Sequence, residues 1–91
     1  MIVTLEEMKQ YLRVDSDDED SLIETLLKAA QQMCMDIMRT EDAEEFSKVE
    51  NAKAAVMYST AYLYEHREEA DHHGLILTLR SLLFGSRREA F

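Results

Sequence analysis

The sequence predicts an all-α protein, a small bundle of three to four helices with a long second and third helix. The 91-residue chain has no Pro and only two Gly, so few residues would interrupt a helix. Its hydrophobic content of 46% is typical of a globular domain. Apolar residues recur at helical spacing in successive stretches of the chain, which favours helices over strands.

The first helix is expected to begin at about Leu5. Thr4 and Glu7 form a capping box, in which each side chain satisfies a backbone N–H that the helix start leaves without a partner. Leu5, Met8 and Leu12 lie at helical spacing, which predicts an amphipathic helix of about two turns. A helix this short needs tertiary packing to be stable.

An acidic run, residues 15–20, directly precedes the second helix. Carboxylates favour the positive end of a helix dipole, so this run is interpreted as the cap and first turn of that helix. The apolar residues that follow are Leu22, Ile23, Leu26, Leu27, Ala30, Met33, Cys34, Ile37 and Met38. Cys34 lies on this apolar face and is expected to be a core residue, since a buried thiol behaves as a small hydrophobe and is usually inert.

The same acidic run has an alternative interpretation as a calcium loop. Asp15, Asp17 and Glu19 match the first three liganding positions of such a loop. However, Asp20 stands where the loop needs Gly for its turn, and Leu26 stands where it needs a bidentate Glu. We therefore expect a helix start without a metal.

Residues 39–46 lose helical periodicity and are expected to form an exposed connection. Ser47 and Glu50 then make a second capping box, which predicts a third helix running to about Glu65. Within residues 54–64 the apolar side chains surround the helix almost completely, as in a helix buried against several neighbours.

Three tyrosines of this third helix, Tyr58, Tyr62 and Tyr64, are interpreted as core packing residues. A ligand cage is the alternative, but aromatic residues at helical spacing are explained by packing alone. Each tyrosine hydroxyl would need a hydrogen-bond partner or water.

The apolar residues after Gly74 predict a fourth, shorter helix or a strand-like entry into one, because the short run 75–77 fits either type. Gly85 is expected to end this helix. The chain would then divide into one helical domain, residues 1–85, and a short flexible C-terminal tail, residues 86–91.

A possible metal site involves His66, Asp71, His72 and His73. Adjacent histidines point in different directions on a helix, and no second pair at i and i+4 completes a site. The chain also contains no nucleophile motif and no Gly-rich phosphate loop. We therefore expect no metal, no cofactor, no catalytic residue and no enzymatic activity.

Charge is distributed unevenly along the chain. Residues 1–50 hold five basic and fourteen acidic residues, whereas residues 51–91 hold five of each, so the net charge of −9 belongs to the N-terminal half. Such a surface repels nucleic acid, which argues against sequence-specific DNA binding. No run of 18 apolar residues is present, and the N-terminus has no basic region followed by an apolar stretch, so no membrane association is expected.

The order and spacing of these segments resemble the head-tail connector family of tailed bacteriophages, whose small helical members are also described as DNA-packaging or head-completion proteins. The matching segments are Thr4-Leu5-Glu6-Glu7 with Lys9, Tyr11-Leu12-Arg13-Val14-Asp15, the acidic run, Leu22-Ile23, Leu27-Lys28-Ala29-Ala30, residues 52–64 and Leu79-Arg80-Ser81-Leu82-Leu83. The resemblance implies a virion structural protein assembled in the bacterial host cytoplasm. It also implies a homo-oligomeric ring between the capsid portal protein and a tail-side connector or stopper protein, with a DNA channel through the ring.

The predicted subunit or partner interface combines the apolar run of the last helix with the basic and aromatic residues near the C-terminus. Its residues are Leu75, Ile76, Leu77, Arg80, Phe84, Arg87, Arg88 and Phe91. An acidic helical regulator that binds a basic protein partner is the alternative function. Such a regulator would spread acidic residues from both halves over one face.

Overall fold

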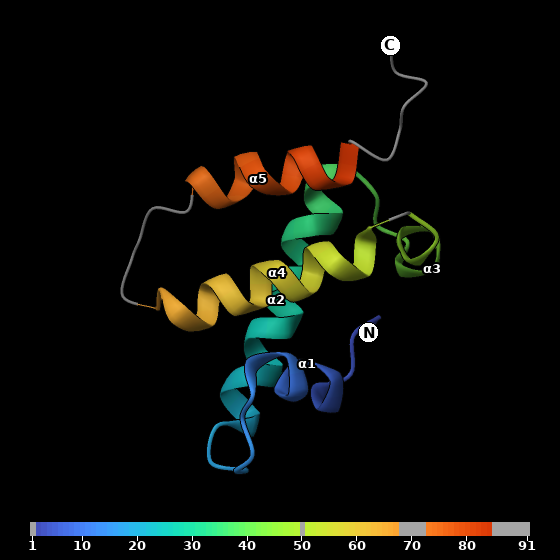
Figure 1. The fold of residues 1–91 in the computed structure, drawn as a ribbon. Coiled ribbons are helices and arrows are strands. Elements are labelled where there is room, and N and C mark those ends of the chain that lie inside the picture. Colours follow the sequence, from blue (N-terminus) through green and yellow to red (C-terminus); the bar gives the residue numbers. More distant parts are fainter. Residues whose placement is uncertain (1, 50, 68–72, 85–91) are drawn as a thin grey trace.

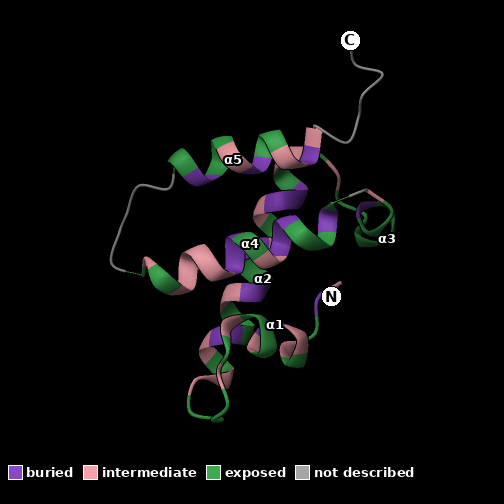
Figure 2. Ribbon diagram, viewed as in Figure 1, coloured by how far each residue is buried: buried purple, intermediate pink, exposed green. Residues whose placement is uncertain are grey.

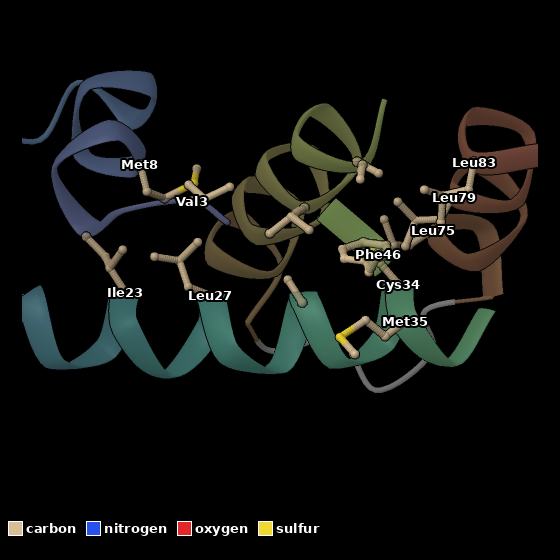
Figure 3. Packing of buried hydrophobic residues seen from close by; sticks show 14 residues of the cluster. Val3, Met8, Ile23, Leu27, Cys34, Met35, Phe46, Leu75, Leu79 and Leu83 are labelled. Carbon is tan, nitrogen blue, oxygen red and sulfur yellow. The ribbon is translucent and has the colours of Figure 1, made fainter. Parts of the chain in front are cut away.

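Helix α2 (Asp20–Met38) is the central helix of the fold, and other helices pack against it along its length (Figure 1). The structure is a computed structural model and describes residues 2–49, 51–67 and 73–84. In these ranges the chain forms five helices and no strand, which confirms the all-α prediction. α1 packs near the N-terminal end of α2, α4 crosses its middle and α5 lies at its C-terminal end (Figures 1 and 3).

Helix α1 (Leu5–Leu12) has the predicted boundaries and cap. The Thr4 hydroxyl accepts a hydrogen bond from the Glu7 amide (3.1 Å), and the Glu7 carboxylate accepts one from the Thr4 amide (3.0 Å). The helix ends at Arg13, which adopts a left-handed conformation (φ 62°) so that Val14 donates to the Lys9 carbonyl. Arg39 ends α2 in the same way (φ 58°).

The start of α2 differs from the prediction. Only Asp20 of the acidic run lies in the first turn, and the N-cap residue, Glu19, makes no side-chain capping bond. The Asp17 and Asp20 carboxylates instead approach Lys9 of α1, and the Glu19 carboxylate approaches α4. Tertiary ion pairs have replaced the expected local cap.

Residues 39–45 are mostly exposed, as predicted, but the segment is not a simple connection. They include most of a short helix, α3 (Ala43–Ser47), capped by Asp42, whose carboxylate accepts from the Glu44 amide (2.9 Å). Phe46 on this helix is fully buried. A single inward residue on a five-residue helix produces no periodicity, which is why the pattern did not reveal it.

Helix α4 (Ala52–Glu65) ends where predicted but begins later, and the predicted capping box is wrong. The Ser47 hydroxyl donates to the Glu44 carbonyl within α3, and Glu50 lies outside the described residues. The N-cap of α4 is Asn51, in a left-handed conformation (φ 73°) and without a side-chain capping bond. The Asn51 side chain reaches the Leu82 carbonyl of α5 (3.4 Å).

The all-round apolar character of α4 correctly indicated contact with several neighbours, since α4 packs on α1, α2, α3 and α5. Its buried residues are small: Ala52, Ala55, Val56, Ser59 and Thr60. The Ser59 and Thr60 hydroxyls donate to the carbonyls one turn earlier, at 2.8 Å and 2.7 Å, so their burial leaves no donor unsatisfied. The tyrosines are less buried than predicted, because Tyr58 is exposed and Tyr62 and Tyr64 are only half-buried.

Helix α5 (His73–Phe84) resolves the ambiguity of the run 75–77 in favour of a helix, with Gly74 inside its first turn. Leu75, Leu79 and Leu83 are spaced four residues apart and are all buried. They project toward Phe46 and Cys34, while the opposite side of α5 is exposed (Figures 2 and 3).

One hydrophobic core connects these helices. Near α1 it consists of Val3, Met8, Ile23 and Leu27, and near α5 it contains Cys34, Met35, Phe46, Leu75, Leu79 and Leu83 (Figure 3). Burying a side chain of Leu, Ile, Met or Phe size contributes about 1.5–3 kcal/mol relative to exposure. The small helix α3 therefore adds a substantial share of the core through Phe46.

Candidate interaction surfaces

The predicted interface residues of α5 fall on different sides of the helix. Leu75 is buried within the chain's own core, whereas Ile76 and Leu77 are 37% and 51% exposed. Arg80 is exposed and Phe84 is half-buried. Arg87, Arg88 and Phe91 lie outside the described residues. The surface available on α5 is therefore the side that carries Ile76, Leu77 and Arg80.

A groove runs between this side of α5 and the C-terminal half of α2. Its lining is Ala29, Gln32, Met33, Asp36, Ile37, Arg39, Ile76 and Arg80. The α2 residues 29, 33 and 36 to 37 recur at helical spacing and form a second stripe beside the core-facing one. Met33, Ile37 and Ile76 give the groove an apolar floor. We call this surface the α2–α5 groove.

The α2–α5 groove is also lined by polar side chains. Gln32 donates to the Asp36 carboxylate (2.8 Å), which partly satisfies the one acidic side chain of the lining. Arg39 and Arg80 contribute two guanidinium groups, and the structure gives neither of them an ion pair within the described part of the chain. An apolar floor with two guanidinium groups suits a partner that offers an apolar or aromatic side chain beside carboxylates.

A second hollow lies between the C-terminal ends of α1 and α4. It is lined by Tyr11, Leu12, Arg13, Tyr58, Ala61, Tyr62, Glu65 and His66. The rings of Tyr62 and His66 stack at 4.1 Å with an interplanar angle of 18°, and Tyr11 is 51% exposed. We call this surface the α1–α4 hollow. Tyrosine combines a large apolar area with a hydroxyl, which is why it is enriched at protein interfaces.

The acidic run follows the end of α1, and Lys9 of α1 contacts two of its carboxylates. The Lys9 ammonium is 3.1 Å from an Asp17 oxygen and 2.8 Å from an Asp20 oxygen, with only 14% of the Lys9 side chain exposed. The carboxylates of Asp20 and then of Asp17 raise the pKa of Lys9, because they stabilise its charged form. Asp15 and Asp18 remain exposed to solvent. We call residues 15–20 the acidic corner. It has an internal ion-pair network with Lys9 and an outer acidic surface formed by Asp15 and Asp18.

Glu19 joins this corner to the end of α4. Its carboxylate accepts a hydrogen bond from the Tyr64 hydroxyl and lies 3.5 Å from the Arg67 guanidinium, which also sits 5.0 Å from the Tyr64 ring centre. The Tyr64 bond and then Arg67 lower the pKa of Glu19, and the same bond raises the pKa of Tyr64. On the other side of α1, Lys53 of α4 pairs with Glu7 and lowers its pKa. Together these contacts join α1, α2 and α4.

Cys34 is fully buried between α2 and α4, and its sulfur lies 3.8 Å from the Ser59 hydroxyl. Burial raises the pKa of the Cys34 thiol to about 11, so the nucleophilic thiolate is disfavoured at neutral pH. The prediction of a core cysteine is confirmed.

The structure offers no support for the metal interpretations. Within the described ranges, no group of three or more His, Cys, Asp or Glu residues is arranged to hold a metal ion. His66 stacks on Tyr62 and His73 begins α5, while Asp71 and His72 fall outside these ranges. In the same ranges, no helix has the length and apolarity needed to span a bilayer.

Sequence reasoning missed Tyr11, Met33, Ile37 and Arg39 as surface residues. One signal was available. Helix α2 carries more apolar residues than a single core-facing stripe needs, because Met33 and Ile37 follow a second line beside Ala30 and Cys34. Which of the two lines faces the core depends on where α4 and α5 pack, and the local pattern does not contain that information.

The fold and these surfaces define a small all-helical protein with candidate interaction surfaces toward both ends of its central helix. The family model of the phage gp6-like head-tail connector protein matches residues 2–88, and the chain belongs to this family. The family is a structural one, and it makes the chain a bacteriophage head-tail connector and a virion component. A comparison with curated proteins and one with solved structures gave no match.

Proposed function

We propose that this connector forms a homo-oligomeric ring between the capsid portal and the next tail component, with the packaged DNA passing through the ring. The observation that carries the proposal is the family match over residues 2–88. Its partners would be further copies of itself, the portal protein, and a tail-side connector or stopper protein. Assembly would take place in the bacterial host cytoplasm.

Physical considerations support assembly with partners. A chain of this size buries only about 60–65% of its unfolded surface, so further burial at interfaces adds stability that the single chain lacks. Four large hydrophobic side chains among the described residues are exposed: Tyr11, Tyr58, Ile76 and Leu77. Burial of these groups against partners would be favourable because it removes apolar area from water.

The negative net charge suits a protein that surrounds DNA without binding it tightly. A net charge of −9 repels phosphate, so a channel lined by acidic side chains would let the genome slide. The acidic residues 15–18 and 41–45 flank opposite ends of α2, whose 19 residues span roughly 28 Å. This separation supports the connector over the alternative regulator, which would need its acidic residues on one continuous face.

In vitro complementation tests the proposal. DNA-filled heads and free tails would be purified from an infection with the parent phage in which this chain is deleted. We expect that adding the purified chain joins heads to tails and produces infectious particles, whereas heads and tails mixed without it stay separate. If the chain binds neither heads nor tails and the yield of particles does not rise, the proposed position between head and tail is wrong.

A further inference from the structure

The exposed hydrophobic side chains divide between two different surfaces. Tyr11 and Tyr58 belong to the α1–α4 hollow, and Ile76 lines the α2–α5 groove with Leu77 next to it on α5. α1 and α5 lie toward opposite ends of α2 (Figures 1 and 3). One copy of the chain therefore carries two unlike surfaces with exposed hydrophobic side chains, on different parts of the molecule.

The charges beside the two surfaces are complementary. Arg39 and Arg80 line the α2–α5 groove. At the other end, Asp15 lines a hollow that shares Arg13 with the α1–α4 hollow, and exposed Asp18 follows three residues later in the chain. Each surface also has a charge of the other sign, and these two charges are complementary as well: Asp36 lines the groove and Arg13 lines the hollow. The groove suits a partner surface that offers an aromatic group beside carboxylates.

We propose that the α2–α5 groove of one copy binds the α1 end of a second copy, with Tyr11 against the apolar floor and Asp15 and Asp18 facing Arg39 and Arg80. This inference rests on the proposed ring and names the surfaces that would form its subunit contact. The two surfaces differ, so the contact is head-to-tail, and repetition of a head-to-tail contact closes a ring when the rotation between copies allows it.

Charge reversal on each surface tests the contact. The variants are R39E/R80E on the groove, D15K/D18K on the corner, and the combination of all four substitutions. Each double variant opposes like charges across the contact, whereas the combined variant restores opposite charges. We expect each double variant to reduce the copies bound per cognate portal about tenfold or more, and the combined variant to recover them. Copies per portal are measured from the mass of the complex after gel filtration.

Matched controls separate this contact from general effects of charge and folding. K28E/K48E makes the same change in charge as R39E/R80E at two exposed positions away from the groove, and it should assemble like wild type. Circular dichroism establishes that each variant folds. An equimolar mixture of the two double variants should also assemble with alternating copies, because the groove of each variant is opposite in charge to the corner of the other.

The outcomes distinguish the inference from the proposed function. If wild type binds the portal in multiple copies and the double variants do so equally well, the proposed contact is wrong and the ring proposal stands. Loss of assembly that the combined variant does not restore also contradicts the pairing. If wild type never binds the portal in more than one copy, the ring proposal itself fails. Disulfide formation between a Tyr11→Cys copy and an Ile76→Cys copy, absent from either variant alone, gives independent support for the pairing.

Discussion

The Lys9 ammonium lies 2.8 Å from an Asp20 carboxylate oxygen, and this contact joins helix α1 to the first residue of α2. Asp17 approaches the same ammonium at 3.1 Å from the loop between the two helices. The alkyl part of Lys9 is largely covered, so the ion pair is partly shielded from solvent. The acidic corner is thus organised around a single lysine, and α1 depends on it for part of its attachment.

Replacing Lys9 by Met is therefore expected to lower the melting temperature by a few degrees at neutral pH. The apolar stem is preserved, but Asp17 and Asp20 lose their cation. Lys28→Met on the exposed side of α2 is the matched control and should change the melting temperature little. Equal melting temperatures for wild type and Lys9→Met, measured by circular dichroism, would show that the Lys9 contacts contribute nothing to stability.

Phe46→Ala should destabilise the fold by about 3–5 kcal/mol, because it removes a fully buried aromatic ring and leaves a cavity. Glu45→Ala, at the neighbouring exposed position, should stay within about 0.5 kcal/mol of wild type. Urea unfolding measures both values. A small effect at Phe46 would mean that α3 does not belong to the core.

Local sequence patterns predicted an element correctly where the interacting groups lie within one turn of each other. The α1 cap was predictable because Thr4 and Glu7 bond to each other's backbone within one turn. Helix α3 was not, since Phe46 is buried only because α2 and α4 meet around it. The capping interactions predicted for residues 15–20 and for Ser47 are wrong, because these side chains interact with other groups.

Local patterns likewise predicted the candidate surfaces only in part. Ile76 and Leu77 of the predicted interface are exposed, but the periodicity of a three-residue run does not reveal that Leu75 is buried. The α2–α5 groove requires knowledge of how two helices distant in sequence pack together. The resemblance to the connector family was visible from the order of segments, which the sequence does contain, and the family match over residues 2–88 confirms it.

The Cys34 thiol should be nearly unreactive toward Ellman's reagent at pH 8 in the native protein. It is fully buried, and its pKa of about 11 leaves only a small fraction as thiolate. The raised pKa stabilises the native state below the thiol's ordinary value near 9, and this contribution is lost as pH rises through about 11. Protein unfolded in guanidinium should react fully. Rapid labelling without denaturant would contradict the buried position.

Glu19 should make stability depend on acidic pH. Its pKa is lowered from 4.5 by Tyr64 and then by Arg67, so its contribution is present above pH 4.5 and is lost as pH falls through the lower native value. Glu19→Gln should therefore reduce the melting temperature most at neutral pH and converge with wild type in acid. Glu24→Gln, on the exposed side of α2, is the control. Parallel melting curves from pH 7 to pH 3 would overturn this role for Glu19.

Deleting residues 86–91 is expected to leave helicity and melting temperature nearly unchanged while weakening attachment to the portal or tail partner. The segment contains Arg87, Arg88 and Phe91, and Arg and aromatic residues are enriched at interface hot spots. Circular dichroism measures the first effect, and binding to purified portal measures the second. Unchanged binding together with a normal yield of virions would remove any docking role from these residues.

Electron microscopy of the purified chain bound to its cognate portal tests the central claim most directly. The connector account predicts a closed ring of several copies stacked coaxially on the portal, with an open channel continuous with the portal's own. Single copies scattered on the portal surface, or a portal that remains bare at high concentration of the chain, would contradict it.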